Sequence, residues 1–441
     1  MQWNLPSGVA FILSRLREKG YEAYVVGGSV RDTLRGEIPH DYDVTTSALP
    51  SETAALFSDC RTVDTGLKHG TLTVLYGDVP YEVTTYRVDG GYTDGRHPDE
   101  VSFAPSLRED AARRDFTVNA MAYAPESGVI DFFGGKQDLE NRILRTVGDP
   151  DRRFSEDALR ILRALRFAAT LDFSIEEKTA ASVCRNKDLL LKISAERIRD
   201  ELSKLLCGKA AFRILKEYRD VMAVCIPELT ATFDFAQRSK HHVYDLYLHT
   251  LHVLCATPPN LTLRMAALLH DVGKPDTFSI DREGNGHFYG HAERSAEMAD
   301  TVLRRLRFDN RTRERIILLV EKHGVELPAT ERSLKRLLRS VGEQAFFELM
   351  TLKKADIAAL SPMHHPRIAE IKSIETAARK LLSDAACFSL RELAVNGSDM
   401  IKLGVSEGKR IGELLDACLE AVIDGRVKNE REALLAFAAA L

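Results

Sequence analysis

The sequence predicts an α+β protein, with a mixed β-sheet and its helices in the N-terminal third and helices alone in the remainder. Short β-branched and aromatic runs broken by glycine occur between residues 21 and 147, which is typical of strands and turns. Beyond about residue 150, apolar residues recur at the spacing of a helix face. At 441 residues the chain is too long for one compact core, so we expect several domains.

The composition indicates a globular protein without a membrane segment. Hydrophobic residues make up 44% and charged residues 29% of the chain, as in ordinary globular domains. No apolar run approaches the roughly 18 residues of a membrane span, and residues 1–20 have the pattern of an amphipathic helix. We therefore expect a cytoplasmic location. The net charge of −4 gives no overall attraction to nucleic acid, so any RNA must be bound by local basic surfaces.

The first element with chemical meaning is a strand followed by a glycine turn. Residues 24–26 are β-branched and aromatic, and a Gly-Gly pair interrupts them where backbone amides can approach a phosphate. A helix starting near Ser29 would point its N-terminal N–H groups at the same anion. Asp41 and Asp43 follow at a spacing of two, which puts both carboxylates on one face of a strand. Each pattern alone also fits a solvated turn, but together they indicate Mg²⁺ chemistry on a nucleotide.

These residues resemble the signature of the nucleotidyltransferase superfamily. The pattern G-G-x-V-R-D, followed about ten residues later by D-x-D, is similar to that of the bacterial class II CCA-adding enzymes and poly(A) polymerases. The resemblance implies a polymerase-β-like catalytic head over residues 1–148, in which Gly28 and Arg31 bind the nucleotide. It also implies that Asp41 and Asp43 are catalytic and hold Mg²⁺.

Two further strand patterns belong to the expected head. They cover residues 71–75 and 79–85, and the second carries Glu82 in a polar-apolar alternation. If this strand lies beside the one that bears Asp41 and Asp43, Glu82 is a candidate third metal ligand. Otherwise it is an exposed strand residue.

Two later segments of the head extend the resemblance. Residues 87–98 are rich in glycine and turn formers, and they resemble the flexible loop with which CCA-adding and A-adding enzymes switch from C to A. The loop argues against an enzyme that adds only C. The run R-R-D-F-T-V-N-A-M-A at residues 113–122 matches a family motif, which implies that Arg114 contacts the triphosphate or the ribose. Residues 131–147 match the next motif and end the head.

We expect residues 154–167 to form one helix with a buried apolar stripe and a polar row. The row steps by three residues and contains Asp157, Arg160, Arg163 and Arg166, so it spans roughly 13 Å along a helix. A surface salt bridge between Asp157 and Arg160 at i,i+3 is the simpler interpretation. Three arginines with a single acid nevertheless leave uncompensated positive charge, which favours the interpretation that this row binds a triphosphate.

The residue types of this row also suit the selection of a base. Cytosine and adenine present an exocyclic amine beside a ring-nitrogen acceptor, so a carboxylate can accept from the amine while a guanidinium donates to the ring nitrogen. Uracil and guanine would leave these groups unpaired, which can discriminate by a factor of about 10⁴ or more. The row resembles the E-D-x-x-R motif of the CCA-adding family. That motif implies that Asp157 and Arg160 act as a protein template and that Arg163 and Arg166 bind the nucleotide.

The helical region over residues 149–225 resembles the neck of the same family. A strong amphipathic pattern covers residues 194–206, with Ser194 as the N-cap and Ile198, Leu202 and Leu205 on the apolar face. We expect a structural role for this helix.

Histidines concentrate in the helical region over residues 226–365. The pair His270-Asp271 follows an apolar run and precedes a turn, and both side-chain types are ligands of divalent first-row metals. The arrangement resembles the HD phosphohydrolase superfamily. This resemblance implies four ligands for a second divalent metal of the transition series: His249, His270, Asp271 and Asp356. His291 and His323 are further candidates, as ligands or phosphate contacts. The alternative is a helical module kept for packing or RNA contact.

Residues 366–441 are predicted to form a helical tail. The run 411–423 has helical spacing and follows several basic residues. The segment resembles the C-terminal tRNA-binding region of CCA-adding enzymes that carry an HD domain. Basic residues there would contact phosphates without reading bases.

The resemblance as a whole implies template-independent addition of CCA to the 3′ end of tRNA from CTP and ATP, with release of pyrophosphate. It implies that tRNA is contacted at its 3′ end and its acceptor/TΨC region, and that no membrane is involved. The HD domain would add a phosphohydrolase activity, for example on a 2′,3′-cyclic phosphate at an RNA end. Two alternatives share these motifs: a poly(A) polymerase, or the A-adding enzyme of a split CC/A pair. A third is an HD metallohydrolase whose head only binds RNA.

Overall fold

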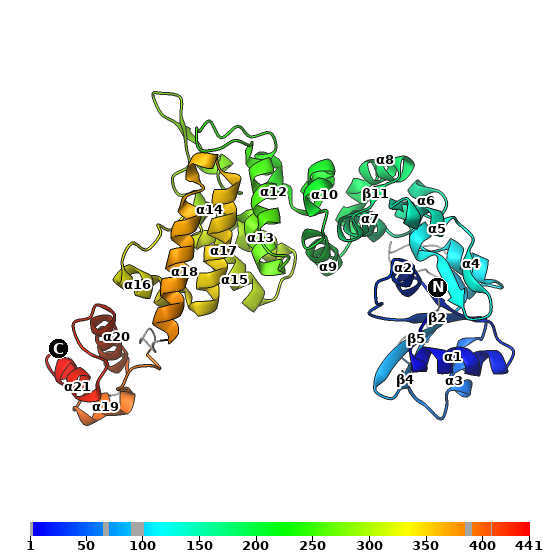
Figure 1. The fold of residues 1–441 in the computed structure, drawn as a ribbon, viewed down its shortest axis with the longest axis horizontal. Helices are drawn as coiled ribbons and strands as arrows, with labels where there is room; N and C mark the ends of the chain where they lie inside the picture. The colour runs from blue at the N-terminus through cyan, green and yellow to red at the C-terminus, as the bar shows by residue number, and fades with distance from the viewer. Residues whose placement is uncertain (1–2, 65–69, 90–100, 384–389, 407) are drawn as a thin grey trace. The chain divides into compact units, whose positions relative to one another are not determined.

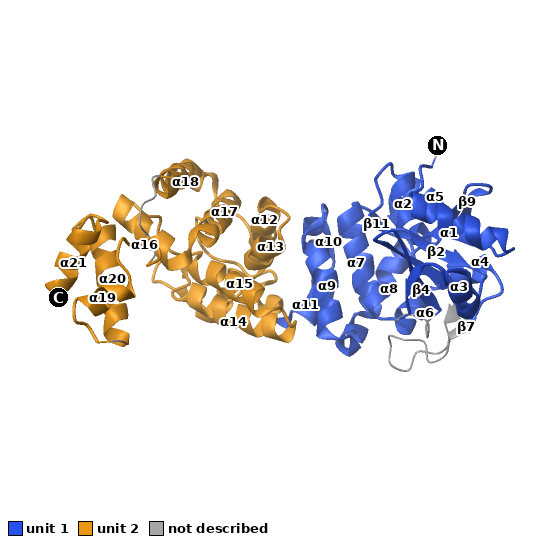
Figure 2. Ribbon diagram, turned by 90° about the horizontal axis from the view of Figure 1, so that it is seen from below, with its two compact units in different colours: residues 1–227 blue, residues 228–441 orange. Residues whose placement is uncertain are grey.

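The computed structural model describes residues 3–64, 70–89, 101–383, 390–406 and 408–441 (Figure 1). Contacts divide the chain into two compact units, Met1–Pro227 and Glu228–Leu441, which Figure 2 shows in different colours. The finer division into four domains stays a prediction. Most of the glycine-rich loop predicted over residues 87–98 lies outside the described residues.

A seven-stranded sheet forms the centre of the first unit and confirms the α+β fold class, since helices make up nearly all of the chain beyond it. Its strands follow the order β3-β4-β5-β2-β1-β8-β9. Their bounds are β1 Ala23–Val26, β2 Asp43–Thr46, β3 Arg61–Val63, β4 Thr71–Tyr76, β5 Val79–Thr85, β8 Met121–Ala124 and β9 Gly128–Asp131. The two strands predicted over residues 71–75 and 79–85 are thereby confirmed as β4 and β5.

The register of the three central strands brings the glycine turn and the acidic residues together. β1 and β2 are antiparallel and pair Val26 with Asp43, so the turn after Val26 lies beside the residues that precede β2. β2 and β5 are parallel and pair Asp43 with Glu82. Since the other described pairs of this sheet are antiparallel, the sheet is mixed, as predicted.

Short helices and loops complete the head. The first helix, α1 (Ser7–Glu18), packs on β1, β2 and β5 with a fully buried apolar face that includes Val9, Ile12 and Leu16, as the amphipathic pattern predicted. The remaining elements are α2 Gly28–Leu34, α3 Pro50–Leu56, β6 Arg87–Asp89, β7 Val101–Phe103, α4 Leu107–Ala112, η2 Thr117–Asn119, α5 Gly135–Glu140 and β10 Ile143–Leu144.

Helices alone, apart from one short strand, build the rest of the first unit. They are α6 Pro150–Glu156, α7 Leu159–Leu171, β11 Ser174–Ile175, α8 Glu177–Arg185, η3 Lys187–Lys192, α9 Ala195–Leu206, α10 Ala211–Glu217 and α11 Arg219–Cys225. The predicted amphipathic helix is confirmed as α9. Ser194 is its N-cap, although the serine side chain makes no capping hydrogen bond. α7 and α9 pack against each other.

The single helix predicted over residues 154–167 is wrong, because the chain breaks between α6 and α7. Asp157 has an extended backbone, with φ −141° and ψ 102°. Its Oδ1 accepts a hydrogen bond from the Leu159 N–H at 3.0 Å, a local side-chain contact of the kind that competes with helical hydrogen bonding. Because of this break, the direction of the Asp157 side chain is not set by the helical periodicity that positions the arginines of α7.

The body of the second unit consists of packed helices with a small hairpin. Its elements are η4 Pro227–Thr232, α12 Leu246–Ala256, α13 Leu261–Leu269, η5 Pro275–Thr277, β12 Ser279–Ile280, β13 Gly286–His287, α14 His291–Arg305, α15 Asn310–Lys322, α16 Glu331–Val341, α17 Glu343–Ala359, η6 Pro362–His364 and α18 Arg367–Ser383. α12, α13, α15 and α17 contact one another, and their apolar faces are buried.

The C-terminal helices form a small core of their own. α19 (Gly397–Lys402), α20 (Lys409–Ile423) and α21 (Arg431–Ala439) bury Met400, Leu419 and Leu434 among them. α20 also contacts α16 through ion pairs such as Arg339–Asp416, and Asp424 at its end pairs with Arg332. Across the described parts of the chain, no helix is long and apolar enough to cross a bilayer.

Candidate active site and histidine cluster

A cavity of about 550 Å³ in the first unit lies where the glycine turn, the central strands and the neck helices meet. Every head and neck residue predicted to belong to the site lines it: Gly28, Arg31, Asp41, Asp43, Glu82, Arg114, Asp157, Arg160, Arg163 and Arg166. The structure therefore brings together residues that are more than one hundred positions apart in the sequence.

The glycine turn brings backbone close to the acidic and basic side chains of the cavity. Gly27 has a φ of 77°, a left-handed conformation that favours glycine. A Cβ at this position would lie 3.0 Å from Nη1 of Arg114 and 3.9 Å from Oδ2 of Asp43. Gly28, the residue emphasised by the sequence pattern, starts α2 in an ordinary helical conformation. Gly27 is thus the position of the pair at which a side chain is least compatible with the turn.

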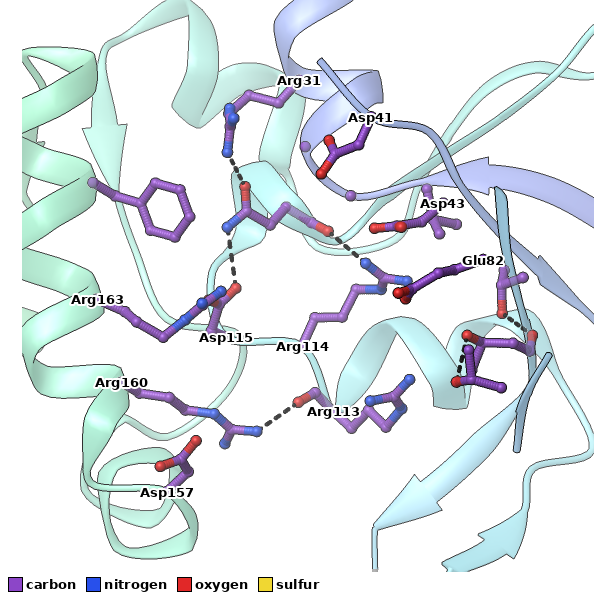
Figure 3. A pocket seen from close by; sticks show the side chains of 18 of the residues that line it. Arg31, Asp41, Asp43, Glu82, Arg113, Arg114, Asp115, Asp157, Arg160 and Arg163 are labelled. Atoms are coloured by element: carbon purple, nitrogen blue, oxygen red, sulfur yellow. Dashed lines mark hydrogen bonds and ion pairs between the residues drawn. The ribbon is translucent and has the colours of Figure 1, made fainter. Parts of the chain in front are cut away.

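Three carboxylates project into the cavity from two neighbouring strands and the loop before them (Figure 3). Asp43 begins β2 opposite Glu82 of β5, and Asp41 lies two residues earlier. Solvent reaches the Asp43 side chain, but the cavity walls remove part of its hydration and raise its pKa to about 6, with further contributions from the charges of Asp41 and Glu82. Arg114 opposes this shift. Such mutual repulsion is what a bound divalent cation would relieve.

A chain of hydrogen bonds connects α2 with the neck. Arg31 donates to Oδ1 of Asn119 at 2.7 Å, and Nδ2 of Asn119 donates to Oδ1 of Asp115 at 3.1 Å. Arg163 of α7 donates to Oδ2 of Asp115 at 2.6 Å. Burial would raise the pKa of Asp115, but Arg163 and Asn119 hold it at about 2. Arg31 and Arg163 also lie over the ring of Phe167, so both guanidinium groups are fixed in place.

Arg114 is held less tightly than Arg31 or Arg163. Its Nη1 lies 3.4 Å from the backbone oxygen of Asn119, and its Nη2 lies 3.6 Å from Oδ2 of the buried Asp110. Burial lowers the pKa of Arg114 and Asp110 opposes this effect, and an arginine remains protonated through such shifts. The guanidinium lies beside Asp43 and Glu82 (Figure 3), where it can donate to a phosphate.

Asp157 pairs with an arginine of another helix. Arg197 of α9 donates to its Oδ2 at 3.1 Å, while its Oδ1 accepts the Leu159 N–H. The described contacts contain no ion pair between Asp157 and Arg160, so the i,i+3 salt bridge considered from the sequence is wrong. The carboxylate retains lone pairs on the cavity side, where Asp157 is part of the wall.

Arg160 is fixed by an acid and by two backbone carbonyls. It donates to Oε2 of Glu156 at 2.9 Å and to the oxygens of Arg153 and Arg113 at 3.2 and 3.1 Å. The bond to Arg113 is visible in Figure 3. Only 9% of Arg160 is exposed. Its guanidinium therefore presents an edge to the cavity in one orientation.

The excess of positive charge predicted along the polar row is wrong. Each arginine has a carboxylate partner: Arg160 with Glu156, Arg163 with Asp115 and Arg166 with Glu201. Asp115 and Glu201 come from elements that are distant in the sequence, so spacing within the row could not reveal them.

Besides Glu201, four residues that position the side chains of the cavity were not predicted from the sequence: Asp115, Asn119, Glu156 and Arg197. Three of them lie inside motifs that were recognised, R-R-D-F-T-V-N and E-D-x-x-R, in which every polar position could have been considered. Arg197 had no comparable signal, because it occupies the polar face of an ordinary amphipathic helix.

The second unit gathers histidines and aspartates into two overlapping groups. These are His249, His270 and Asp271, and Asp271, His291 and His323. Within each group the potential ligand atoms lie within 4.8 Å of one another, and no other described set of three is this close. Asp356 lies next to the first group, with its Oδ1 3.1 Å from Nε2 of His249. The structure thus brings together all four predicted ligands and both additional candidates.

The backbone fixes the tautomer of three of these histidines. Nδ1 of His270, His291 and His323 lies 2.6 to 2.7 Å from the carbonyl oxygen three residues earlier. Because Nδ1 donates there, the neutral ring directs a lone pair on Nε2 into the cluster. The Nε2 atoms of His291 and His323 are 3.2 Å apart. Two such lone pairs would repel each other unless a cation lay between them.

Asp271 is shared by both groups. Its Oδ2 lies 3.1 Å from Nε2 of His270, and its Oδ1 lies 3.5 and 3.4 Å from Nε2 of His291 and His323. Burial would raise the pKa of Asp271, but His270 and Lys274 hold it well below its usual range. The buried Nε2 atoms of His249 and His270 face the carboxylate oxygens of Asp356 and Asp271, each at 3.1 Å, without making a well-aligned hydrogen bond. This donor set fits divalent transition metals, and Asp271 belongs to both groups.

Three family profiles match successive parts of the chain. The profile described as "Poly A polymerase head domain" matches residues 23–145, which contain the sheet and the glycine turn. "Probable RNA and SrmB- binding site of polymerase A" matches residues 172–232, and "tRNA nucleotidyltransferase domain 2 putative" matches residues 288–438.

Curated relatives match over nearly the whole chain. The chain is 34% identical over 429 residues to the CCA-adding enzyme of Lactobacillus helveticus, covering 96% of this chain and 94% of that protein. It is 35% identical over 432 residues to the CCA-adding enzyme of Lactiplantibacillus plantarum, covering 97% and 94%.

Two solved structures show the same fold. The crystal structure of the Bacillus stearothermophilus CCA-adding enzyme in complex with CTP is 30% identical, has a TM-score of 0.74 and covers 99% of this chain and 98% of that chain. The Thermotoga maritima CCA-adding enzyme complexed with tRNA_CCA is 22% identical, has a TM-score of 0.59 and covers 98% and 93%. At that identity the second similarity concerns the fold alone.

Proposed function

Because the chain belongs to the family of CCA-adding enzymes, we propose that it adds C, C and A to the 3′ end of tRNA from CTP and ATP, without a nucleic-acid template and with release of pyrophosphate. One observation carries this proposal. The acidic residues that suit metal-assisted nucleotidyl transfer line the same cavity as Asp157 and Arg160, the pair that suits cytosine and adenine. We place the reaction in the cytoplasm, where tRNA is matured.

Asp41 and Asp43, with Glu82 beside them, would hold Mg²⁺. The raised pKa of Asp43 is consistent with this assignment, because it results first from partial burial and then from the charges of Asp41 and Glu82, and a bound cation would offset both effects. When bound, Mg²⁺ activates the terminal 3′-hydroxyl for attack on the α-phosphate and offsets the charge of the departing pyrophosphate. Arg114, whose guanidinium lies beside Asp43 and Glu82, would donate to the triphosphate.

Base selection follows from two side chains held at fixed angles. Asp157 accepts from the exocyclic amine of cytosine or adenine, and Arg160 donates to the neighbouring ring nitrogen. Arg197 and Glu156 hold these two groups in place. Arg163 and Arg166 stabilise the cavity through Asp115 and Glu201, and contact the nucleotide from α7.

The deciding experiment supplies tRNAs that end at the discriminator base, at C or at CC, each with CTP, ATP, UTP or GTP alone. The proposal expects two C residues and then one A, with little incorporation of U or G. Addition of A only to the CC-ended tRNA would indicate the A-adding enzyme of a split pair. Long A tails on any RNA would indicate a poly(A) polymerase.

A second function is supported by the histidine cluster, namely hydrolysis of phosphoesters. The Nε2 atoms that converge on carboxylate oxygens and the shared Asp271 fit two divalent transition metals, which would be held by His249, His270, Asp271 and Asp356 and by Asp271, His291 and His323. Metals held by these residues would lower the pKa of water and so supply the nucleophile at neutral pH. The attack on phosphorus breaks one P–O ester bond, and the leaving oxygen takes up a proton. A 2′,3′-cyclic phosphate at an RNA end is a suitable substrate for an enzyme that repairs 3′ termini.

This second function is tested with RNA ending in a 2′,3′-cyclic phosphate and with added Mn²⁺, Co²⁺ or Ni²⁺. We expect ring opening that depends on the metal and is lost in His270→Ala. If the cyclic end stays intact under all three metals, the cluster serves packing instead.

A further inference from the structure

An exposed pair of stacked aromatic rings lies at the mouth of the histidine cluster. Tyr289 is 77% exposed, and its ring is parallel to that of His287, with an interplanar angle of 5° and centroids 5.4 Å apart. Tyr289 and His287 line a cavity of about 540 Å³ together with Asp271, His291 and Asp356. We call this pair the tyrosine–histidine stack. It leaves one face of the tyrosine uncovered beside the proposed metals.

The stack is held by a stiffened hairpin. Asp281 accepts hydrogen bonds from the backbone N–H groups of Glu283 and Asn285 at 2.9 Å each, and its Oδ2 lies 2.9 Å from Nε2 of His287. Gly286 passes so close to the neighbouring loop that a Cβ would lie 2.4 Å from the backbone oxygen of Gln237. A tyrosine on such a support loses little conformational freedom when it binds a ligand.

The hairpin packs against half-buried aromatic rings. The centroids of Phe235 and Phe278 are 5.3 Å apart, and those of Phe278 and Phe288 are 5.5 Å apart. Lys274, which pairs with Asp271 at 2.7 Å, lies over the Phe288 ring. The aromatic support and the metal ligands are therefore part of one packed assembly.

Cationic side chains complete the same cavity. Lys274, Lys353 and Arg367 contribute to its wall. Arg367 is exposed at the start of α18 and has no described ion pair. A ligand suited to this cavity carries negative charge near the metals and a flat ring within reach of Tyr289.

We propose that the tyrosine–histidine stack is a platform for the nucleobase of a nucleotide or RNA-terminal phosphoester, whose phosphate is directed at the histidine cluster by Lys274 and Arg367. The proposal rests on the phosphohydrolase function above and adds its substrate specificity. Stacking of a base on an aromatic side chain contributes about tenfold to a hundredfold in affinity and tolerates any base. The preference is therefore for a nucleobase as such, not for one base over another.

The test compares hydrolysis of adenosine 3′-monophosphate with hydrolysis of ribose 5-phosphate, which lacks a base. For Tyr289→Ala we expect the ratio of kcat/KM for these two esters to fall at least about tenfold, mainly through KM for the nucleotide. Tyr289→Phe keeps the ring and should keep the ratio. The matched control is Tyr244→Ala, which removes a tyrosine stacked on His252 in the same unit but outside this cavity. An unchanged ratio in Tyr289→Ala would overturn the platform while leaving the hydrolase intact.

A binding measurement separates the platform from catalysis. The metal-free full-length protein, with its head cavity saturated by CTP, is irradiated with 8-azidoadenosine 3′-monophosphate, and labelled peptides are identified by mass spectrometry. Labelling of the 279–291 segment that Tyr289→Ala abolishes supports the platform, even if no ester is hydrolysed under any metal. Labelling elsewhere in the chain, unaffected by Tyr289→Ala, refutes it. Repeating the hydrolysis with an RNA that ends in a 3′-phosphate shows whether free nucleotide or RNA is the preferred source.

Discussion

The head cavity and the histidine cluster differ in how their potential metal ligands are arranged. In the head, Asp41, Asp43 and Glu82 surround an open space and do not form one of the described groups whose ligand atoms lie within 4.8 Å. In the cluster, His249, His270, His323 and Asp271 are buried, His291 is half-buried, and their ligand atoms already converge. The head is incomplete without its ligands, whereas the cluster is preassembled.

This difference follows from the chemistry expected at each place. Mg²⁺ takes a few carboxylates together with water and substrate phosphates, so an open set of acids suits a metal that arrives with the nucleotide. Imidazoles fixed through Nδ1 suit a metal that stays with the protein. We infer that metal exchanges with substrate in the head and is retained in the cluster.

The strongest test of this comparison is a pair of substitutions. Asp43→Ala should lower CCA addition by about 10³-fold or more, with hydrolysis of a cyclic phosphate unchanged. His270→Ala should abolish hydrolysis and leave CCA addition unchanged. Both activities are measured on one tRNA preparation. If either substitution impaired both reactions, the two sites would not be independent.

The retention of bound metal should also differ between the head cavity and the histidine cluster. After loading with Mn²⁺ or Ni²⁺ and gel filtration, we expect bound metal in the wild-type protein and in Asp43→Ala, and loss of it in Asp271→Ala, because Asp271 belongs to both groups. Metal content is measured by elemental mass spectrometry. A retained metal should also raise the free energy of unfolding, by about 2.7 kcal/mol at a hundredfold excess over Kd.

Base selection in the head should depend on Asp157 separately from metal binding. Asp157→Ala is expected to reduce the preference for CTP over UTP by at least about tenfold while some transfer remains, because the acceptor for the exocyclic amine is lost. Single-nucleotide incorporation into tRNA ending at C measures this preference. Asp188→Ala, an acid of the neck outside the cavity, is the matched control. Unchanged selectivity would contradict the template assignment.

Mg²⁺ binding in the head should weaken in mild acid. The folded pKa of Asp43 is about 6, above its ordinary value of 3.8, so a proton competes with the metal as the pH falls through about 6, at up to about tenfold per pH unit. In the metal-free protein the native state binds more protons than the unfolded state between these values. The contribution of Asp43 therefore lowers stability as the pH rises through this window. Calorimetric titration of Mg²⁺ at several pH values should show the effect, and Asp43→Asn should remove it.

The smallest expected effect concerns Arg197. Arg197→Gln should reduce the preference for CTP over UTP by about threefold to tenfold, since Asp157 loses a charged hydrogen-bond partner but keeps its bond to Leu159. Arg199→Gln, on the same helix, is the control. Arg197→Lys should retain part of the preference. If Arg197→Gln left the preference for CTP over UTP unchanged, Asp157 would be oriented by its backbone contact alone.

The sequence predicted the sheet and the cavity wall better than it predicted the ion pairs. Alternating patterns identified β4 and β5 because one face of each strand is buried. The resemblance to the family motifs identified the predicted residues that line the cavity. The partners of Arg163 and Arg166 could not be identified in this way, because Asp115 and Glu201 approach them only through tertiary packing.

The helix break at Asp157 shows a second limit of sequence reasoning. Apolar side chains are buried on both sides of the break, Phe154 in α6 and Leu162 and Leu165 in α7. A single aspartate whose side chain binds the Leu159 N–H was enough to end one helix and begin another. Periodicity reports which side of an element is buried, not whether the backbone is continuous. In the second unit the resemblance supplied the ligands, whereas the convergence of six residues needed the structure.

The register of β2 has a consequence for how this protein can vary. Asp43 is paired on both sides, with Val26 and with Glu82, and side chains alternate between the two faces of a sheet. One residue inserted or deleted inside this four-residue strand would turn the aspartate away from its neighbours and expose side chains that are now buried. We therefore expect insertions and deletions to be far better tolerated in the surface connections than in β2. This strand is too short to accommodate a shift in register.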